Sequence, residues 1–576
     1  MTAKANSKNN PDISLVVSGA AGQGIQTVEK VLVSLLKGTG RHVYATKEYM
    51  SRVRGGTSST SIRASVHPVR GFIERIDVLI PFTEESMLAL KTRINSDTVV
   101  LFDPNLSKDD PDLEARIAKV PIFETAKEAG NRLYANSVAV GVVAGMCGLS
   151  RESAQREIND LFGKMDSEIR AGNVKAVMAG YDLGENLQDH PQLSTEPSQT
   201  TRDRLLLNGS QAVGLGAISA GCNMVTSYPM SPGTGLLTFM AAKAEKFGIA
   251  VTQVEDEISA VNMAIGGWFG GGRAIVTTSG GGFALMSEGI SLAAMTETPL
   301  VVHVAQRPGP ATGLATRTEQ GDLEIVLHAG HGEFPRIVLA PGTLEEAVIL
   351  GSKAFEMSDR FQVPVFILTD QYFVDTYYDI ERMDLKPGDP KNFVVPAKEG
   401  YCRYQLTSDG ISPRAVPGYG DGIVVVSGNE HTENGHITED AETRILMNDK
   451  RLNKMDIIRS GAIAPTITGK HGGDTFVVCW GSTFPMVEEA VASLDLNVDI
   501  MHFSQVYPID ESAIKQLSQA KRLIMVEQNA TGQFSRLLRA YYGVETHESI
   551  LKYDGRPFSL EYLMTKLESL TTGGRK

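Results

Sequence analysis

Tyr228-Pro229-Met230-Ser231-Pro232-Gly233-Thr234 is the most informative stretch of the sequence, and an acidic segment, Val254–Ala260, follows it. The two prolines fix φ and restrict the residues before them, so the turn can present the Ser231 and Thr234 hydroxyls rigidly. In the acidic segment, Glu257 opens an apolar, glycine-rich run. A carboxyl group in such a run is partly desolvated, which raises its pKa and suits proton exchange with a cofactor nitrogen. The alternative is a plain helix N-terminus, where the helix dipole favours acids.

Size and composition limit the class of protein. The chain has 576 residues, more than a single hydrophobic core usually supports, so about three or four domains are expected. The formal net charge of -13 argues against nucleic acid and anionic membranes as partners. Residues 1–10 are polar without an apolar signal region, and no apolar run approaches the length of a membrane span. We therefore expect a cytoplasmic protein that does not bind a membrane.

The cysteines exclude several kinds of site. There are 4, and they are far apart without a Cys-x-x-Cys pair: Cys147, Cys222, Cys402 and Cys479. This spacing predicts no disulfide framework, no structural zinc site and no iron–sulfur cluster held by this chain alone. We expect no metal site in this chain.

The pattern of strands and helices predicts a multidomain α/β protein. A buried strand at 13–19, a glycine-rich turn at 20–24 and a helix at 25–36 open a first domain, 11–185. A polar, proline-containing linker is expected at 186–204. In a second domain, 205–385, the gaps between strands are long enough for crossover helices, which predicts a parallel sheet. Residues 386–474 lack periodicity and are expected to form an irregular excursion that carries interface contacts, and 475–570 form a smaller α/β domain.

Four segments of the sequence resemble, in order, motifs of the alpha subunits of 2-oxoacid:ferredoxin oxidoreductases, the thiamine-diphosphate enzymes that make acyl-CoA. The segment 228–234 resembles their Tyr-Pro-Ile-Thr-Pro-Ser-Thr signature, and 255–260 resembles their acidic motif. Residues 277–288 resemble their Thr-Ser-Gly-x-Gly-Phe run, and 307–323 resemble the stretch that follows. Each motif is weak alone, but four in order are specific. Residues 13–180 also resemble the family's gamma domain, here fused ahead of the alpha domain, so the resemblance covers nearly everything after residue 10.

The resemblance implies a fold and roles for particular residues. The second domain would be a pyrimidine-binding-type thiamine-diphosphate domain and the last one a transketolase-C-terminal-like domain. Glu257 would hydrogen-bond the pyrimidine ring, with Glu255 as the second candidate. Ser279, Gly280 and Phe283 would also contact the cofactor.

The same resemblance implies a substrate site. Tyr228, Ser231 and Thr234 would contact the 2-oxoacid, and Arg317 would bind its carboxylate, with Arg307 as the competing arginine. Two departures stand out. Met230-Ser231 replaces the usual Ile-Thr, which loses a methyl group, and Gly233 replaces the usual Ser, which loses a hydroxyl and adds flexibility.

The chain lacks the second half of a thiamine-diphosphate site, which is a Gly-Asp-Gly with an Asn well downstream. Gly420-Asp421-Gly422 is followed too closely by Asn429, and we predict a strand-initiating turn there. The resemblance therefore implies a separate beta subunit that completes the thiamine diphosphate site and brings Mg²⁺ and a 4Fe–4S cluster. A dimer of heterodimers would be the assembly.

The glycine-rich turn of the first domain, 19–24, is not the dinucleotide fingerprint Gly-x-Gly-x-x-Gly. Gly22 and Gly24 can still place N–H groups near an anion, with Arg54 and Gly55 as a second contact. The gamma-domain resemblance suggests CoA as that anion. A tight turn beside solvated arginines is the equal alternative.

Three hypotheses remain at this stage. The first is a fused gamma–alpha subunit that oxidatively decarboxylates a 2-oxoacid with CoA and passes electrons to ferredoxin. Its substrate would be 2-oxoglutarate first, then pyruvate or a branched-chain 2-oxoacid. The second is a non-catalytic, CoA-binding assembly subunit, against which the acid at Glu257 and the motif around Arg317 argue. The third is a transketolase-type enzyme without ferredoxin, against which the missing diphosphate motif argues.

Overall fold

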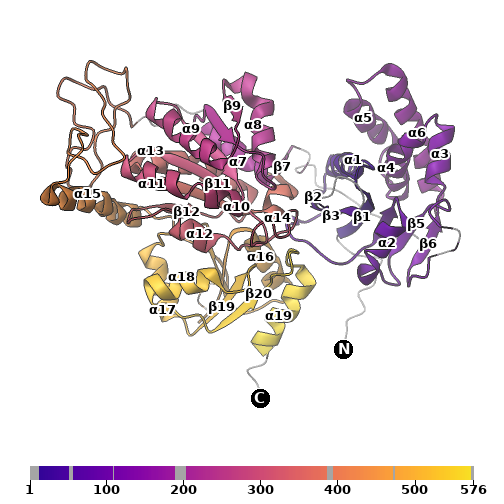
Figure 1. The fold of residues 1–576 in the computed structure, drawn as a ribbon. Helices are drawn as coiled ribbons and strands as arrows, with labels where there is room; N and C mark the ends of the chain where they lie inside the picture. The colour runs from indigo at the N-terminus through magenta and orange to yellow at the C-terminus, as the bar shows by residue number, and fades with distance from the viewer. Residues whose placement is uncertain are drawn as a thin grey trace. The chain divides into compact units, whose positions relative to one another are not determined.

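A computed structural model describes residues 12–50, 56–107, 109, 111–187, 201, 203–385, 393–470, 472 and 474–572. Most of the expected linker, together with Arg54 and Gly55, lies outside the described residues. The chain divides into two compact units (Figure 1). The first unit contains Met1–Leu207, Thr376–Arg382 and Ser559–Glu561, and the second contains the rest of the chain.

The first unit is built on a mixed eight-stranded sheet. Its strand order is β6 (Arg116–Lys119), β5 (Val99–Phe102), β4 (Val78–Pro81), β1 (Asp12–Ala20), β3 (Thr57–Ser65), β2 (His42–Glu48), β14 (Tyr377–Ile380) and β7 (Leu205–Asn208). The four strands from β6 to β1 are parallel, whereas β3, β2 and β14 pair antiparallel. Strands β4 and β5 are buried along their whole length, and their continuous apolar sequence is typical of such strands.

Strands β7 and β14 fall in the range 205–385 that was expected to belong to the second domain, yet they lie in the sheet of the first unit. Tyr377 of β14 pairs with Ala45 of β2. Local sequence indicates that such a short run is a strand, but it carries no information about which sheet the strand joins.

Helices of the first unit pack on this sheet and on each other. They are α1 (Ile25–Gly38), α2 (Glu84–Leu88), α3 (Ile122–Glu128), α4 (Ala135–Met146), α5 (Arg151–Leu161), α6 (Ser167–Glu185), and two 3₁₀ turns, η1 (Lys91–Arg93) and η2 (Arg132–Tyr134). Glycines spaced four apart let α4 and α6 approach closely. A Cβ added to Gly141 would lie 2.1 Å from the Val177 carbonyl oxygen, and one added to Gly184 would lie 2.1 Å from that of Val142. The pair of helices therefore requires these glycines.

The second unit contains a seven-stranded sheet that is parallel except at one edge. Its order is β18 (Gln505–Tyr507), β12 (Ile337–Leu339), β13 (Pro364–Asp370), β11 (Leu300–Gln306), β10 (Ala274–Thr278), β8 (Met224–Ser227) and β9 (Ala250–Gln253). The helices of this part are α7 (Gly209–Ser219), α8 (Thr234–Phe247), α9 (Glu257–Phe269), α10 (Gly280–Leu285), α11 (Ser287–Met295), α12 (Leu323–His328), α13 (Leu344–Phe361) and α14 (Gln371–Asp375). The central strands β10, β11 and β13 are buried throughout, which confirms the expected parallel sheet.

The region 386–474 is only partly the irregular excursion that was expected. Residues 393–440 are largely loops, but α15 (Ala441–Ser460) is a helix of 20 residues (Figure 1). Its buried face includes Lys450, Arg451 and Lys454, so it lacks the apolar periodicity that marks a helix in sequence. The strand predicted after Gly420-Asp421-Gly422 does not form either, because residues 423–427 have no regular structure.

The last domain has a five-stranded sheet with the order β15 (Thr466–Gly469), β17 (Asp499–Phe503), β16 (Thr475–Trp480), β19 (Arg522–Glu527) and β20 (Glu548–Leu551). All its pairs are parallel except β15 with β17. Its helical segments are η4 (Gly481–Thr483), α16 (Phe484–Ser493), α17 (Glu511–Gln519), α18 (Gln533–Tyr542) and α19 (Leu560–Thr572).

Candidate functional site

The Tyr228–Thr234 turn lies at the carboxyl end of β8, where it leads into α8. Ligands of open parallel sheets bind at this edge. Thr234 is the first residue of α8, and its N–H donates to the Met230 carbonyl over 3.1 Å. Tyr228 is 38% exposed, whereas Ser231 is half-buried.

Gly233 holds this turn against the next strand. Its carbonyl accepts a hydrogen bond of 3.0 Å from the Thr277 hydroxyl, and an added Cβ would lie 2.8 Å from the Thr278 carbonyl oxygen. Its φ is -60°, an ordinary helical value. Gly233 therefore allows the turn to approach β10 closely, and it does not provide the flexibility that the sequence suggested.

Glu257 is a buried acid at the start of α9. Asp256 is the N-cap and accepts from the Ser259 N–H over 2.7 Å, so the helix start has its own capping acid. The Glu257 side chain is 2% exposed, and its Oε1 has no hydrogen-bond partner among the described residues. Burial, helped by the Asp256 charge, raises the Glu257 pKa. Glu255, the second candidate, is exposed.

The first turn of α10, Gly280–Gly282, lies directly against Glu257 and is called the glycine turn below. A Cβ added to Gly282 would lie 2.3 Å from Glu257 Oε1 and 2.2 Å from the Thr278 hydroxyl. Ser279, at the start of the same turn, is fully buried, and its hydroxyl also lacks a partner within the described chain. Phe283 is buried edge-on against Phe366, with ring centroids 5.3 Å apart, which is a core contact.

The two candidate arginines lie in different surroundings. Arg307 follows β11, and its Nη1 donates to the Ser231 carbonyl over 2.8 Å. Its Nε has no partner in the described residues, and burial lowers its pKa while Asp322 opposes that shift. Arg317 lies against the last domain, where a Cβ added to Gly555 would be 3.2 Å from the Arg317 Cβ. Arg307 thus contacts the Ser231 turn directly through a hydrogen bond.

Sequence reasoning missed two groups. Asp322 is the N-cap residue of α12, and a Cβ added to Gly280 would lie 2.2 Å from its Oδ1. His303, in β11, contacts the Thr277 hydroxyl through Nδ1 and the Thr369 hydroxyl through Nε2, each at 2.8 Å. Burial lowers the His303 pKa to about 3, so this imidazole is neutral and orients Thr277. An acid inside the last motif was the only available signal for Asp322.

The glycine turn of the first unit adopts left-handed φ values of 87° at Gly22 and 74° at Gly24. It borders a hollow of ≈ 350 Å³ whose lining includes Lys47 and Glu48. The Ala21 and Gln23 N–H groups are already bonded to the Gly56 and Ala20 carbonyls. These donors are therefore committed within the fold, and an anion role for Gly22 and Gly24 stays a prediction.

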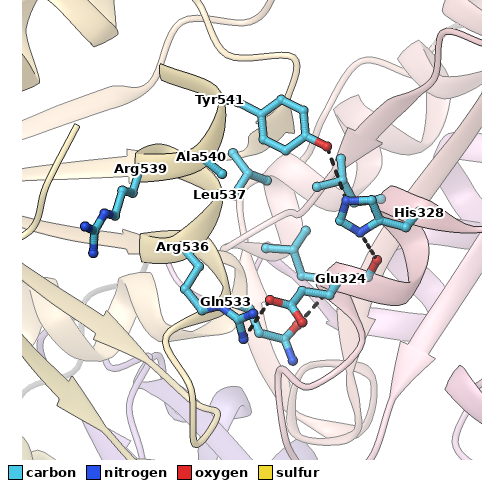
Figure 2. A pocket seen from close by; sticks show the side chains of 10 residues that line it. Glu324, His328, Gln533, Arg536, Leu537, Arg539, Ala540 and Tyr541 are labelled. Carbon is cyan, nitrogen blue, oxygen red and sulfur yellow. Dashed lines mark hydrogen bonds and ion pairs between the residues drawn. The ribbon is translucent and has the colours of Figure 1, made fainter. Parts of the chain in front are cut away.

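A cleft of ≈ 670 Å³ lies between α12 and α18 (Figure 2). His328 contacts the Tyr541 hydroxyl through Nε2 at 3.2 Å, and Arg536 pairs with Glu324 at 3.0 Å. The Glu324 backbone also forms hydrogen bonds with the side chains of Gln533 and His328 (Figure 2). We assign the cleft to packing of the last domain on the domain that contains the seven-stranded sheet.

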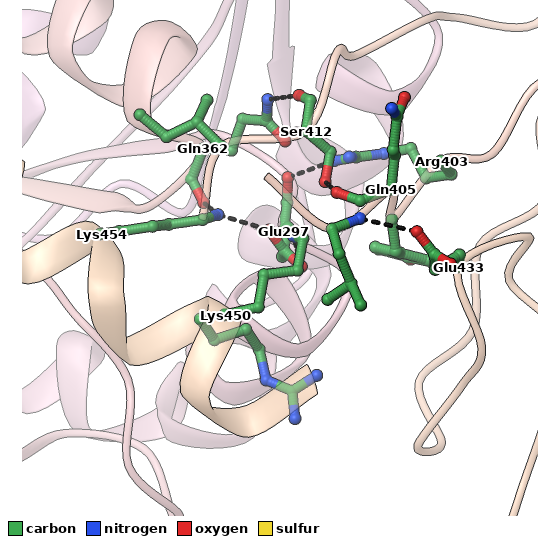
Figure 3. A network of polar contacts seen from close by, with 12 residues as sticks. Glu297, Gln362, Arg403, Gln405, Ser412, Glu433, Lys450 and Lys454 are labelled. Carbon is green, nitrogen blue, oxygen red and sulfur yellow. Dashed lines mark hydrogen bonds and ion pairs between the residues drawn. The ribbon is translucent and has the colours of Figure 1, made fainter. Parts of the chain in front are cut away.

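A buried ionic cluster joins α15 to the end of α11 (Figure 3). The Glu297 carboxylate pairs with Lys450 at 2.7 Å and with Lys454 at 2.5 Å, and all three side chains are 1% exposed. Arg403 donates to the Glu297 carbonyl over 2.6 Å. The Glu297 carboxylate is paired with both lysines, so the cluster fastens the excursion to the domain.

Across the described ranges, no group of three or more His, Cys, Asp and Glu side chains can hold a metal ion. The 4 cysteines are unpaired, and 3 of them are buried. In the same ranges, no helix is both long and apolar enough to cross a membrane.

Comparison with known proteins adds independent evidence. The family model described as pyruvate flavodoxin/ferredoxin oxidoreductase, thiamine diP-bdg, matches residues 215–450. The model described as pyruvate ferredoxin/flavodoxin oxidoreductase matches residues 14–183. A 2-oxoacid:ferredoxin oxidoreductase subunit alpha from Sulfolobus sp is 30% identical, with 98% of each chain covered. The chain belongs to the family of 2-oxoacid:ferredoxin oxidoreductase alpha subunits.

Other relatives of this alpha-subunit family narrow the comparison. The 2-oxoglutarate synthase subunit KorA from Methanocaldococcus jannaschii is 34% identical over 59% of this chain and 90% of its own. A structure of 2-oxoglutarate:ferredoxin oxidoreductase from Magnetococcus marinus, with 2-oxoglutarate, coenzyme A and succinyl-CoA bound, has a TM-score of 0.90 at 29% identity and covers 97% of this chain and 100% of its own. The resemblance stated from the motifs and the multidomain α/β fold are both confirmed.

Proposed function

We propose that this chain supplies the pyrimidine-binding half of a thiamine-diphosphate site in a 2-oxoacid:ferredoxin oxidoreductase. The overall reaction converts a 2-oxoacid and CoA to acyl-CoA, CO₂ and a proton, with two electrons passed to ferredoxin. One observation carries the proposal. Glu257 Oε1 is buried without a hydrogen-bond partner in the described chain, at a glycine turn that leaves no room for a side chain.

The residues present fit the cofactor. The raised pKa of Glu257 lets its carboxyl group hold a proton at Oε1 and exchange it with a ring nitrogen. Ser279 and Gly280 would line the same place, where the Ser279 hydroxyl is also buried without a hydrogen-bond partner in the described chain. When bound, thiamine diphosphate supplies a nucleophilic carbon and an electron sink for decarboxylation.

Arg307, Ser231 and Thr234 would bind the 2-oxoacid. The Arg307 guanidinium is anchored at Nη1 on the Ser231 carbonyl, while Nε remains without a partner in the described chain. An anchored guanidinium with a spare donor suits a carboxylate. Arg307 is therefore our first candidate for the substrate carboxylate, with Arg317 second and Tyr228 at the exposed rim.

A partner chain would complete the enzyme. The motif resemblance supports a beta subunit that would hold Mg²⁺, the diphosphate and a 4Fe–4S cluster. Ferredoxin would accept the electrons, and a dimer of heterodimers would form. CoA would bind near Gly22 and Gly24, and Arg54 and Gly55 stay candidates from sequence alone.

2-Oxoglutarate is the first substrate candidate, because two of the relatives are named for it. Pyruvate and branched-chain 2-oxoacids come next. A non-catalytic CoA-binding subunit is the remaining alternative, and the unsatisfied buried acid at Glu257 argues against it, because such a group costs stability unless a ligand uses it.

The test is to purify the native complex and to follow CoA-dependent reduction of a low-potential dye with 2-oxoglutarate, pyruvate and a branched-chain 2-oxoacid. Glu257→Gln should reduce turnover by about 10²–10⁴-fold, the usual worth of a positioned acid. Glu255→Gln, the exposed acid two residues earlier, is the matched control and should retain activity. Activity from this chain alone, or full activity in Glu257→Gln, would show that the cofactor site is misplaced.

A further inference from the structure

We propose that Asp322 is a positioning residue that faces Arg307 and controls how strongly the guanidinium attracts an anionic substrate. The inference rests on the proposed function, because it concerns the same substrate site. Asp322 belongs to the loop before α12, and Arg307 follows β11. The loop places two opposite charges beside the turn that carries Ser231.

The backbone fixes the Asp322 carboxyl group in place. The Asp322 N–H donates to Gln306 Oε1 over 2.9 Å, and Gln306 is the residue before Arg307. On its other side, the carboxyl group lies on Gly280, where an added Cβ would be 2.2 Å from Oδ1 and 2.3 Å from Oδ2. Asp322 is therefore held between the Arg307 strand and the glycine turn.

Asp322 and Glu257 lie on the same glycine turn. Glu257 Oε1 abuts the Cβ position of Gly282, two residues after Gly280. Within the described chain, Oδ2 of Asp322, Oε1 of Glu257 and Nε of Arg307 are all buried without a hydrogen-bond partner. Buried polar atoms are nearly always paired, so two unpaired carboxyl oxygens at one turn, together with an unpaired N–H of the arginine whose charge acts on Asp322, indicate a ligand site.

The charges of Asp322 and Arg307 act on each other, although Asp322 Oδ2 and Arg307 Nε have no hydrogen-bond partner in the described chain. An ionised Asp322 would compete with a substrate carboxylate for Arg307. A protonated Asp322 leaves that charge to the substrate and offers an O–H donor instead.

The surrounding groups decide when Asp322 ionises. Burial raises its pKa to about 7, the negative charge of Glu319 adds to the shift, and Arg307 opposes it. Glu257 faces it across the glycine turn, and Glu324, on the first turn of α12, is paired with Arg536 (Figure 2). Below this pKa the group is neutral, and above it the group repels an anionic substrate. Substrate affinity should therefore fall as the pH rises through about 7.

The test uses the native complex and 2-oxoglutarate, with KM and kcat measured separately between about pH 6 and pH 8.5. In the unaltered enzyme, KM should rise by about tenfold across this window, as expected for a like charge close to the substrate carboxylate. In Asp322→Asn the KM should stay flat near its low-pH value. Glu324→Gln, with the same charge change two residues later, should follow the unaltered enzyme.

A second variant keeps the inference testable if Asp322→Asn fails to assemble. Glu319→Gln removes a negative neighbour, so Asp322 ionises more easily and the KM step should move to lower pH by about half a unit. A KM in Asp322→Asn that rises as in the unaltered enzyme, or a Glu319→Gln step that stays in place, overturns the inference. Absence of any 2-oxoacid-dependent activity in the unaltered complex would instead contradict the proposed function.

Discussion

Two buried glutamates, Glu257 and Glu297, have opposite surroundings. Both side chains are almost inaccessible to solvent. Glu257 has an oxygen without a partner in the described chain, and burial raises its pKa. Around Glu297, burial opposes ionisation, but the ammonium groups of Lys454 and Lys450 hold the pKa well below its usual range. Burial alone therefore does not mark a functional acid, and we propose that the unpaired buried oxygen of Glu257 is a ligand-binding group.

The difference in pKa between the two acids follows from the groups that surround each carboxylate. Glu297 receives charges from α15, a segment more than 140 residues later, so its carboxylate fastens two parts of the chain (Figure 3). The Glu257 carboxyl group interacts with its own backbone N–H and with the Thr278 hydroxyl, while Oε1 has no hydrogen-bond partner among the described residues. The paired carboxylate of Glu297 stabilises the fold, and we propose that the unpaired oxygen of Glu257 binds a ligand.

Removal of the carboxylate from the ionic cluster should have the largest effect. Glu297→Gln leaves Lys450, Lys454 and Arg403 buried without a counter-charge, and we expect a loss of about 3–5 kcal/mol in the free energy of unfolding. Chemical denaturation, followed by circular dichroism, measures it. Glu439→Gln, an exposed acid in the same excursion, should change stability by less than about 0.5 kcal/mol. Equal stability of the two variants would show that the cluster does not fasten α15.

A methyl group placed against Glu257 should damage function more than stability. In Gly282→Ala the new Cβ would need the space 2.3 Å from Glu257 Oε1, so the carboxyl group must move. A shift of about 1 Å in the position of a catalytic group costs about 10²-fold in turnover, and we expect a loss of that size here. Dye reduction by the native complex measures it.

Gly281→Ala is the matched control for this change. It lies in the same turn, but its nearest neighbour would be 3.8 Å away, an ordinary contact. Activity should stay within about threefold of the unaltered enzyme, which is under 1 kcal/mol in the barrier. Similar losses in Gly281→Ala and Gly282→Ala would indicate that the turn, and not the Glu257 contact, is what matters.

The two regions also differ in how far the sequence predicts them. Tyr228, Ser231, Glu257 and the motif around Arg307 could be found because turns, acids and glycines follow one another in a local order. Helix α15 could not, because its buried face carries Lys450 and Lys454, whose partner Glu297 is distant in sequence. Charged residues in a helix usually indicate a solvated face.

Tertiary contacts account for the remaining errors. The contact of Asp322 with Gly280 joins two motifs that looked independent, and only the folded chain brings them together. The pairing of β14 with β2 likewise depends on the sheet edge that the chain reaches, not on the local sequence. Local patterns thus indicate candidate site residues, whose roles stay predictions, while folding decides which of them meet.

The ionic cluster should make stability depend on pH in the alkaline range. One carboxylate faces two ammonium groups, and burial lowers the Lys454 pKa from its ordinary value of 10.5 to about 7. Between these values the unfolded chain binds a proton that the folded chain lacks, so the free energy of unfolding should rise with pH by at most about 1.4 kcal/mol per unit. Lys454→Met should lack this part of the slope. Identical slopes in both proteins would place the proton elsewhere.

Ser231→Thr should have the smallest effect, and on selectivity only. The variant restores the threonine of the motif that this turn resembles, and the hydroxyl is kept while one methyl group is added at a half-buried position. Stability should stay within about 0.5 kcal/mol, because the residue is not part of a packed core. The ratio of kcat/KM for 2-oxoglutarate to that for pyruvate should fall by about threefold, since one methyl group in a pocket discriminates weakly. An unchanged ratio together with a large stability loss would mean that Ser231 belongs, like Glu297, to the part of the chain that holds the fold together.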